Sequence, residues 1–366
     1  MRNSAFTMSS VFLAAMLAAP ATGQTGAAPT PSDGYFYKTQ PVADHVSLIY
    51  RPDPVRVPAE GNVEVIEQTD GLVVVDAGGT PAGGARVVEQ IRRISPKPVK
   101  YLIYTHWHYD HNLGAPAFRA AYPGLRIIST EATRADMTGA PMAGVATMAA
   151  AWRGNAGSIA QRLAKPDGLD AEQVRRYAQA EADAPLIAKA YEGATAVPAD
   201  ITFSDRLSLP DRVAPVEVLF LGKANTDGDA IVWLPQQKIV VTGDVVVLPY
   251  PFGAASYPQS WLAVLHRIES FDFVAMIPGH GEVQHDRRYI DKLIALIEDV
   301  QNQVEPAARR GESLDDISRK VDFAKEYAIF AGNSHWLHNG FKGYFLDSMV
   351  KNAYLEARGE PIGQGG

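Results

Sequence analysis

The chain has 366 residues, a formal net charge of −7 and no cysteine. Its apolar share of 46% is ordinary for a globular protein, and its length suits one large domain or two closely joined ones. The sequence has no Lys/Arg-rich block, which argues against a nucleic-acid partner because phosphate binding needs a concentrated basic surface. Without cysteine there is neither a disulfide nor a thiolate ligand, so any metal site must use His, Asp or Glu.

The first residues have the pattern of a signal peptide. Arg2 precedes the apolar core 11–20 (VFLAAMLAAP), and residues 21–23 (ATG) are small, as a signal peptidase requires. The core is too short for a permanent anchor, and no other stretch of the sequence is long and apolar enough to span a membrane. We therefore predict a signal peptide over 1–23, a mature chain from about Gln24, and a periplasmic or secreted protein without an integral membrane segment. A disordered apolar tail is the alternative.

The elements predicted along the rest of the chain are those of a layered α/β domain. Residues 24–60 are expected to hold a Pro/Ala/Thr-rich linker and a first strand. A hairpin over 63–75 turns at Asp70-Gly71. Further strands and helices are expected at 99–104, 126–129, 216–221, 230–234, 238–242 and 274–277 (strands) and at 85–94, 259–270, 287–304 and 344–357 (helices). Because strands alternate with helices and several strands end in polar residues beside glycine, the site is expected at the strand ends.

Residues 131–199 break this alternation. The segment is rich in alanine and methionine and has helical stretches, but no clear strand precedes Ile201. Two interpretations fit: a helical insertion that lies over the domain, or core-forming helices without a role in the site. We predict a domain over 61–285 that contains this insertion, followed by C-terminal helices over 286–366 that pack on the domain.

The run 105–112 (THWHYDHN) places three histidines and an aspartate within six residues, directly after a predicted buried strand. A helix cannot aim all of these side chains at one point, whereas a tight loop at a strand end can. Neutral imidazole and carboxylate are usual ligands of zinc and similar ions. His106 and His108 can converge on one ion, while Asp110 and His111 can serve a second. A surface histidine patch is the alternative, but such a patch would not usually follow a buried strand.

This run resembles the His-x-His-x-Asp-His hallmark of the metallo-β-lactamase superfamily. Asp76, after the apolar run 72–75, resembles the first motif of that family. Residues 242–244 (TGD) resemble the motif of a bridging carboxylate, and residues 278–281 (PGHG) resemble the motif of the last metal-binding histidine. The order and spacing agree over about 63–281. The resemblance implies an α/β fold, a four-layer αββα sandwich with metal ions at one edge of its two sheets.

The resemblance also implies one or two metal ions held by six side chains: His106 and His108 for the first ion, Asp110, His111 and His280 for the second, and Asp244 between them or closer to one. Asp76 is expected to orient neighbouring groups rather than to bind metal. Zinc is the expected metal because the ligands are rich in histidine, with iron and manganese as alternatives.

One ligand position departs from the family pattern. Residues 222–229 read GKANTDGD where the family has Gly-x-x-His-Thr-x-Gly-Asp, so Asn225 replaces the third imidazole of the first ion. A carbonyl oxygen is a weaker zinc ligand than an imidazole. We therefore expect the second site to be tighter and one-metal forms to occur. Three further histidines are possible substitutes: His285, His335 and His338. Each of these alone, like His45 near the first predicted strand, is more often a structural residue than a ligand.

The expected chemistry is hydrolysis. A metal ion lowers the pKa of bound water from about 15.7 toward roughly 7, which makes hydroxide available to attack a carbonyl. Asp110 is expected to orient this water and to pass on its proton, and His106 or His108 becomes a general base if the first site is empty. Candidate substrate contacts are Trp107, Tyr109, Tyr250 and Tyr257, whereas Phe252 and Trp261 are expected to belong to the core.

The sequence thus predicts an exported, β-lactamase-like zinc hydrolase that acts on a small amide, lactone or ester. No Lys or Arg close to the motifs is an obvious clamp for a substrate carboxylate, which argues against a specialised β-lactamase. A thioesterase or phosphodiesterase on the same fold is one alternative. A metal-binding protein with little turnover, degraded at Asn225, is another.

Overall fold

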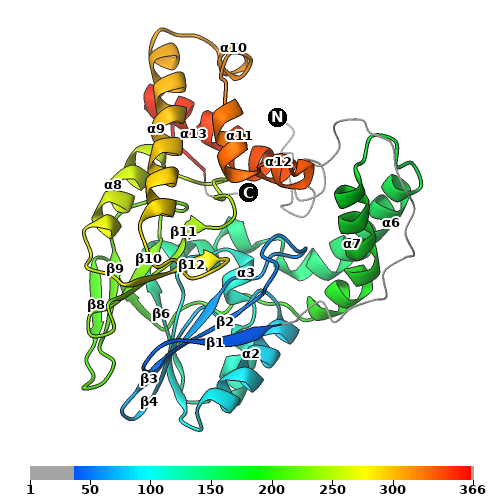
Figure 1. Cartoon of the computed structure of the whole chain (residues 1–366). Coiled ribbons are helices and arrows are strands. Elements are labelled where there is room, and N and C mark those ends of the chain that lie inside the picture. Colours follow the sequence, from blue (N-terminus) through cyan, green and yellow to red (C-terminus); the bar gives the residue numbers. More distant parts are fainter. Residues whose placement is uncertain (1–36, 364–366) are drawn as a thin grey trace.

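Two β-sheets pack face to face between outer layers of helices in the computed structural model, which describes residues 37–363 (Figure 1). The four-layer αββα prediction is confirmed. The predicted signal peptide and most of the predicted linker lie outside the described residues. Within 37–363, none of the helices combines the length and apolar character that a membrane span needs.

The first sheet has seven strands in chain order: β1 (Lys38–Ala43), β2 (Val46–Tyr50), β3 (Val63–Gln68), β4 (Gly71–Val75), β5 (Val99–Ile103), β6 (Arg126–Thr130) and β7 (Ile201–Phe203). Strands β1 to β4 are antiparallel, and β4 to β7 are parallel. The prediction of one strand before residue 60 is wrong, because β1 and β2 form a hairpin there. Its turn holds His45 at a φ of 67°, and none of the β1 residues is fully buried, so β1 lacks an apolar pattern.

The second sheet has five strands in the order β12 (Ala275–His280), β11 (Ile239–Val247), β10 (Ala230–Leu234), β9 (Val216–Phe220) and β8 (Arg206–Leu209). Only the β11–β12 pair is parallel. Strand β8 was not predicted from the sequence; it is a four-residue edge strand in which only Leu209 is buried. The two sheets bury a shared layer of mainly branched side chains, among them Val73, Val75, Ile103, Val218, Val232 and Val241.

Helices cover the outer face of each sheet. Helices α2 (Pro81–Ile94) and α4 (Ala115–Ala121) pack on the first sheet, and α8 (Pro258–Glu269) and α9 (Arg288–Arg309) pack on the second. Helix α2 begins four residues before the predicted start. Thr80 caps it by accepting a hydrogen bond from the Gly83 amide at 2.8 Å, and Gly84 lies so close to the Gly114 backbone that any Cβ would clash. The two glycines, which disfavour a helix in isolation, concealed this start.

The insertion consists of α5 (Glu131–Thr138), the 3-10 turns η1 (Ala140–Met142) and η2 (Val145–Thr147), α6 (Met148–Leu163) and α7 (Ala171–Ala190). Helices α6 and α7 project from one side of the sandwich in Figure 1. They meet the C-terminal helices at α12 (His335–Phe341), where the Tyr177 and Trp336 ring centroids lie 5.6 Å apart. The segment adds residues to the core of the first sheet and forms a small cluster with Trp336. Because Met148 and Trp152 also line the cavity described below, the interpretation that the segment has no place at the site is wrong.

The C-terminal region packs on α8 and α9. It contains α10 (Leu314–Ser318), α11 (Ala324–Phe330), α12, the π-helical turn η3 (Lys342–Leu346) and α13 (Asp347–Arg358). The helix predicted over 344–357 is thus the end of a longer helical run, and the π-helical turn interrupts it. Such turns are frequent at functional sites.

Candidate metal centre

The loop after β5 carries most of the centre. Strands β4 and β5 are parallel neighbours, so the residues that follow them meet at one sheet edge. Asp76, which follows β4, accepts a hydrogen bond from the Thr105 amide at 2.9 Å. The Asn112 side chain donates to the carbonyls of Trp107 and His108 at 2.7 and 2.6 Å. These bonds fold 105–112 into a tight loop that ends in the short helix α3 (Tyr109–Asn112).

The first ligand set is His106, His108 and Asp244, all buried. His106 Nε2 lies 2.8 Å from His108 Nδ1 and 3.6 Å from Asp244 Oδ2. Thr105 Oγ1 donates its hydrogen to Asp76 Oδ2, so it must accept from His106 Nδ1, which lies 2.9 Å away. The His106 proton therefore resides on Nδ1, and the lone pair of Nε2 faces the other two groups, as metal binding requires.

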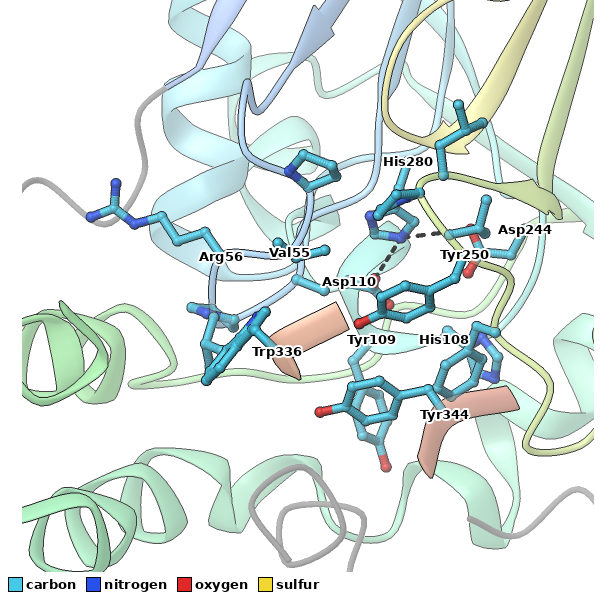
Figure 2. Close-up of a pocket in the computed structure, with 18 of the residues that line it drawn as sticks. Val55, Arg56, His108, Tyr109, Asp110, Asp244, Tyr250, His280, Trp336 and Tyr344 are labelled. Carbon is cyan, nitrogen blue, oxygen red and sulfur yellow. Dashed lines mark ion pairs between the residues drawn. The ribbon is translucent and has the colours of Figure 1, made fainter. Parts of the chain in front are cut away.

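The second ligand set is Asp110, His111 and His280. His280, at the end of β12, lies with Nε2 3.0 Å from Asp110 Oδ2 (Figure 2). The same nitrogen lies 3.2 Å from His111 Nε2. Asp76 Oδ2 accepts from His111 Nδ1 at 2.7 Å, which turns the His111 lone pair toward the set. Asp244 also reaches this set, with Oδ1 3.2 Å from His111 Nε2. The six side chains that the sequence assigned to two ions thus lie together.

The electrostatics of the centre favour a cation. Burial, followed by the neighbouring imidazoles, lowers the pKa of His106 well below its usual value, and burial lowers the pKa of His108 to about 4. Both rings are therefore neutral at pH 7, the form that binds metal, and His108 is a weak base. Burial also lowers the pKa of His111, but the carboxylates of Asp244, Asp110 and Asp76 outweigh it and raise that pKa well above the usual value. Three carboxylates around one imidazole leave negative charge that an ion would neutralise.

Asp110 keeps its negative charge. Burial raises the pKa of its carboxyl group, but the charge of His111 and the hydrogen bond from His280 outweigh burial and hold that pKa well below the usual range. Its side chain is 22% exposed, more than the other members of the two sets. An ionised carboxylate that faces solvent can both bind an ion and accept a proton.

Several buried polar atoms of the centre lack a hydrogen-bond partner, and such atoms show whether these residues fit a metal ion. Within the described residues, His108 Nε2, Asp244 Oδ1 and both amide atoms of Asn225 are buried without a hydrogen-bond partner. Each such atom costs about 1–3 kcal/mol. Coordination by an ion offsets this cost for a ligand oxygen such as Asp244 Oδ1, and a set of imidazole nitrogens and carboxylate oxygens suits zinc. The residues fit the metal that the sequence predicted.

Asn225 lies in a tight turn after β9. Asp229 Oδ2 accepts hydrogen bonds from the amides of Thr226 and Ala224 at 2.7 and 3.2 Å, and this closes the turn. Asn225 is fully buried. Its side-chain carbonyl has a lone pair to offer, but it remains a weaker donor than the imidazole that the family pattern places there.

The remaining histidines do not replace that imidazole. His285 Nδ1 contacts the Val274 carbonyl at 3.4 Å, His335 Nδ1 pairs with Asp170 at 2.9 Å, and His338 Nε2 contacts the Gly332 carbonyl at 2.8 Å. His45 lies in the β1–β2 turn. All four belong to neither ligand set, so the idea that one of them substitutes for the missing ligand is wrong.

A cavity of about 140 Å³ opens at the ligand atoms and is bordered by His108, Asp110, Asp244 and His280. Its other walls are mainly apolar and aromatic, and we call it the metal pocket. Side chains from distant elements build these walls: Met148 and Trp152 of α6, Tyr191 after α7, Tyr250 and Phe252 after β11, Trp336 of α12 and Tyr344 of η3. Five of these residues were not predicted from the sequence: Met148, Trp152, Tyr191, Trp336 and Tyr344. No local pattern marks these residues, because they reach the pocket only through the packing of the insertion and the C-terminal helices.

Three predictions about aromatic residues need correction. Trp107 is 1% exposed and belongs to the core under the first sheet, not to the pocket. Tyr257 precedes α8, where the Lys223 ammonium group lies 4.5 Å from its ring centroid, and it does not line the pocket either. Phe252 was expected in the core but lines the pocket, with its ring centroid 5.2 Å from that of His108.

Tyr109 and Tyr250 line the pocket as expected of substrate contacts, and Trp261 is fully buried as predicted. The Tyr109 hydroxyl donates to the Pro141 carbonyl at 2.6 Å, which ties the histidine loop to the insertion. Tyr250 lies against the Gly340 backbone of α12. The pocket walls are therefore fastened to both the insertion and the C-terminal helices.

Comparison with known proteins agrees with this geometry. The sequence profile of the metallo-beta-lactamase superfamily matches residues 56–280, which is more than half of the chain. The chain belongs to this superfamily. The matched range contains both ligand sets and ends at His280, and the resemblance drawn from the motifs is confirmed.

Two relatives are alkylsulfatases. A linear primary-alkylsulfatase from Pseudomonas sp. is 26% identical over 317 residues, which cover 78% of this chain and 56% of that protein. The chain thus spans about half the length of this curated relative. The solved structure of a stereoselective inverting sec-alkylsulfatase from Pseudomonas sp. has a TM-score of 0.61 and 18% identity, and it covers 99% of this chain and 61% of its own. A metallo-beta-lactamase from Pontibacter korlensis has a TM-score of 0.48 and 18% identity, covering 72% of this chain and 99% of its own.

Proposed function

We propose that this protein is an exported zinc-dependent hydrolase that cleaves an ester bond in a small, largely apolar substrate. The observation that carries the proposal is the position of the two ligand sets at the border of an apolar, aromatic-walled pocket. Ligand pockets combine such walls with a few convergent polar groups. Export rests on the signal-peptide pattern of residues 1–23.

The metal would be held by the two sets, with the Asn225 carbonyl as a further candidate ligand of the first. When bound, zinc lowers the pKa of a water molecule to about 7 and polarises the bond under attack. Asp244 would tie the sets together, because one of its oxygens faces His106 and the other faces His111. Since the first set lacks an imidazole, the second would hold metal more tightly.

Asp110 would position the attacking water and carry its proton to the leaving group. Asp110 borders the metal pocket and is ionised, and its contact with His280 fixes its orientation. Asp76 would act through His111, whose ring it orients. The apolar walls would hold the substrate body and keep bulk water from the bond being cleaved.

We prefer an ester over an amide as the substrate because one relative is named an alkylsulfatase, and alkyl sulfates are esters. A sulfate ester is the second candidate. Arg56 supplies the single guanidinium group of the pocket lining and pairs with Asp183 at 2.6 Å, so bound metal would have to balance the sulfate charge. A carboxylic ester carries no negative charge that the pocket must balance, so we place it first.

The test is a panel of substrates assayed on the zinc-loaded full chain with and without chelator. The panel contains p-nitrophenyl carboxylic esters, alkyl sulfates, lactones, thioesters, nitrocefin and bis-p-nitrophenyl phosphate. We expect the carboxylic esters to be hydrolysed fastest, with loss of activity in chelator and recovery with zinc. Faster turnover of nitrocefin, of the phosphodiester or of an alkyl sulfate would contradict the carboxylic-ester assignment. Failure to hydrolyse any of the compounds would favour a metal-binding protein with little turnover.

A further inference from the structure

A second recess of about 290 Å³ adjoins the metal pocket. We call it the arginine recess, since Arg56, Arg175 and Arg176 line it together with Asp53, Glu172 and Trp336. The two cavities share Val55, Arg56, Val57 and Trp336. In Figure 2, Val55, Arg56 and Trp336 lie on the side of the metal pocket remote from Asp244, and the Arg56 guanidinium group points away from the ligand sets.

Two of the three guanidinium groups of the arginine recess have carboxylate partners. Arg56 Nη2 pairs with Asp183 Oδ2 at 2.6 Å, and Arg176 pairs with Asp53 and, at 3.9 Å, with Glu172. Glu172 also accepts a hydrogen bond from the Ser334 hydroxyl at 2.7 Å. The two carboxylates of the lining are thus already engaged.

Arg175 differs from its neighbours. It is exposed at the rim of the recess, and no described residue forms an ion pair or hydrogen bond with its guanidinium group. Asp183 serves Arg56, and Asp53 and Glu172 both lie against Arg176, so Arg175 is the one guanidinium group of the lining without a carboxylate partner among the described residues. A cationic group would meet carboxylates that already have partners, whereas an anionic group would meet a guanidinium group that has none.

We infer that the substrate is amphiphilic, with its ester at the ligand sets and a monoanionic group, such as a carboxylate, at its far end in the arginine recess. This inference deepens the proposed function and rests on it. The apolar body would lie along the aromatic walls, and its end would extend past Val55 and Trp336, which line both cavities, toward Arg175. The arginine recess would then select among apolar esters by their far end.

The experiment compares two series of p-nitrophenyl esters on the zinc-loaded full chain. Their acyl chains have four to ten carbons and end either in a methyl group or in a carboxylate. We expect the carboxylate series to have a kcat/KM about fivefold higher at its best chain length, since exposed ion pairs contribute modestly. The preference should shrink in 0.5 M NaCl because salt screens exposed charges.

Variants locate the effect. Arg175→Gln should remove the preference, and Arg175→Glu should reverse it in favour of esters that end in an amine. Arg153→Gln is the matched control, because Arg153 is an exposed arginine of α6 that pairs with Glu192 and does not line the arginine recess. That variant should keep the wild-type preference.

The outcomes separate the two proposals. Equal or lower rates for the carboxylate series at every length, or an unchanged preference in Arg175→Gln, would overturn the amphiphilic substrate while ester hydrolysis itself stands. If no ester is hydrolysed, the proposed function fails. Tryptophan fluorescence titrations with decanedioate and decanoate then test anion binding in the arginine recess without any need for hydrolysis. Tighter binding of decanedioate to wild type than to Arg175→Gln supports an anion site there, and equal binding to both proteins rejects it.

Discussion

At the scale of single residues, the centre depends on hydrogen bonds that decide which ring nitrogen presents its lone pair. Asp76 is the common partner, since it accepts from Thr105 and from His111. Such partners orient metal ligands and tune their basicity. Asp76 therefore determines the geometry of both ligand sets, although it belongs to neither.

Asp110→Asn tests the role of the pocket-facing carboxylate. The substitution keeps the size of the side chain but removes its charge and its capacity to take a proton. We expect kcat/KM for ester hydrolysis to fall by about 100-fold or more. Glu181→Gln, which neutralises an exposed carboxylate of α7, is the control and should retain full activity. An active Asp110→Asn enzyme would remove this residue from the mechanism.

Asn225→His tests the degraded first site. An imidazole is a stronger zinc ligand than an amide carbonyl. We expect the purified variant to hold more zinc per chain than wild type at equal free zinc, as measured by elemental analysis after dialysis. Asn302→His, an exposed change on α9, controls for adventitious binding by an added histidine. Equal zinc content in wild type and Asn225→His would show that position 225 does not contribute a ligand.

At the scale of elements, α12 shapes the metal pocket through one close approach. A Cβ built on Gly340 would overlap the Tyr250 ring, so Gly340→Ala should displace a pocket wall. We expect a loss of about 1–3 kcal/mol in the free energy of unfolding and a higher KM for apolar esters. Gly154 lies in α6 with open space at its Cβ position, so Gly154→Ala should instead stabilise the protein by about 0.5–1 kcal/mol. Thermal melts and ester kinetics on both variants decide the matter.

Helix α5 and the turn that carries Asn225 are joined by two carboxyl groups. Burial and the neighbouring Asp227 carboxylate raise the pKa of Asp136 to about 7. This lies above the unfolded value of about 3.9, so the folded state binds the proton more tightly. The resulting stability is fully present below about pH 4 and is lost as the pH rises through about 7.

Asp136→Asn should therefore flatten this pH dependence. Since the amide cannot ionise, we expect the Tm of the variant relative to wild type to rise between pH 5 and pH 8 in calorimetric melts. Glu181→Gln provides the control for loss of a surface charge. Parallel Tm curves for wild type and Asp136→Asn across this range would contradict a raised pKa for Asp136.

At the scale of the whole molecule, the centre joins the two sheets. His106 to His111 follow a strand of the first sheet, whereas Asp244 and His280 belong to β11 and β12 of the second. An ion bound between them stabilises the folded state by mass action, by about 4 kcal/mol when free metal is 1,000 times the dissociation constant. We expect chelation to lower the Tm by several degrees and zinc to restore it. An unchanged Tm in chelator would argue against a bridging ion.

Residues that are neighbours in the chain could be predicted from the sequence, whereas residues that only the packing of distant elements brings together could not. His106, His108, Asp110 and His111 were found because the ligands are neighbours in the chain after one buried strand. Met148, Trp152, Trp336 and Tyr344 were not found because each lies on a helix whose apolar residues serve both core and pocket. Strand β8 was missed for a related reason, since four residues at a sheet edge give too short a pattern.

The whole account depends on an ion at the edge where the two sheets meet. Anomalous diffraction from crystals of the zinc-loaded protein, recorded on both sides of the zinc edge, locates such an ion directly. We predict a strong peak about 2.0–2.2 Å from His111 Nε2, His280 Nε2 and an Asp110 oxygen, and a weaker one beside His106 and His108. A map without a peak at these nitrogens, from crystals of protein that still hydrolyses its ester in chelator, would contradict the account.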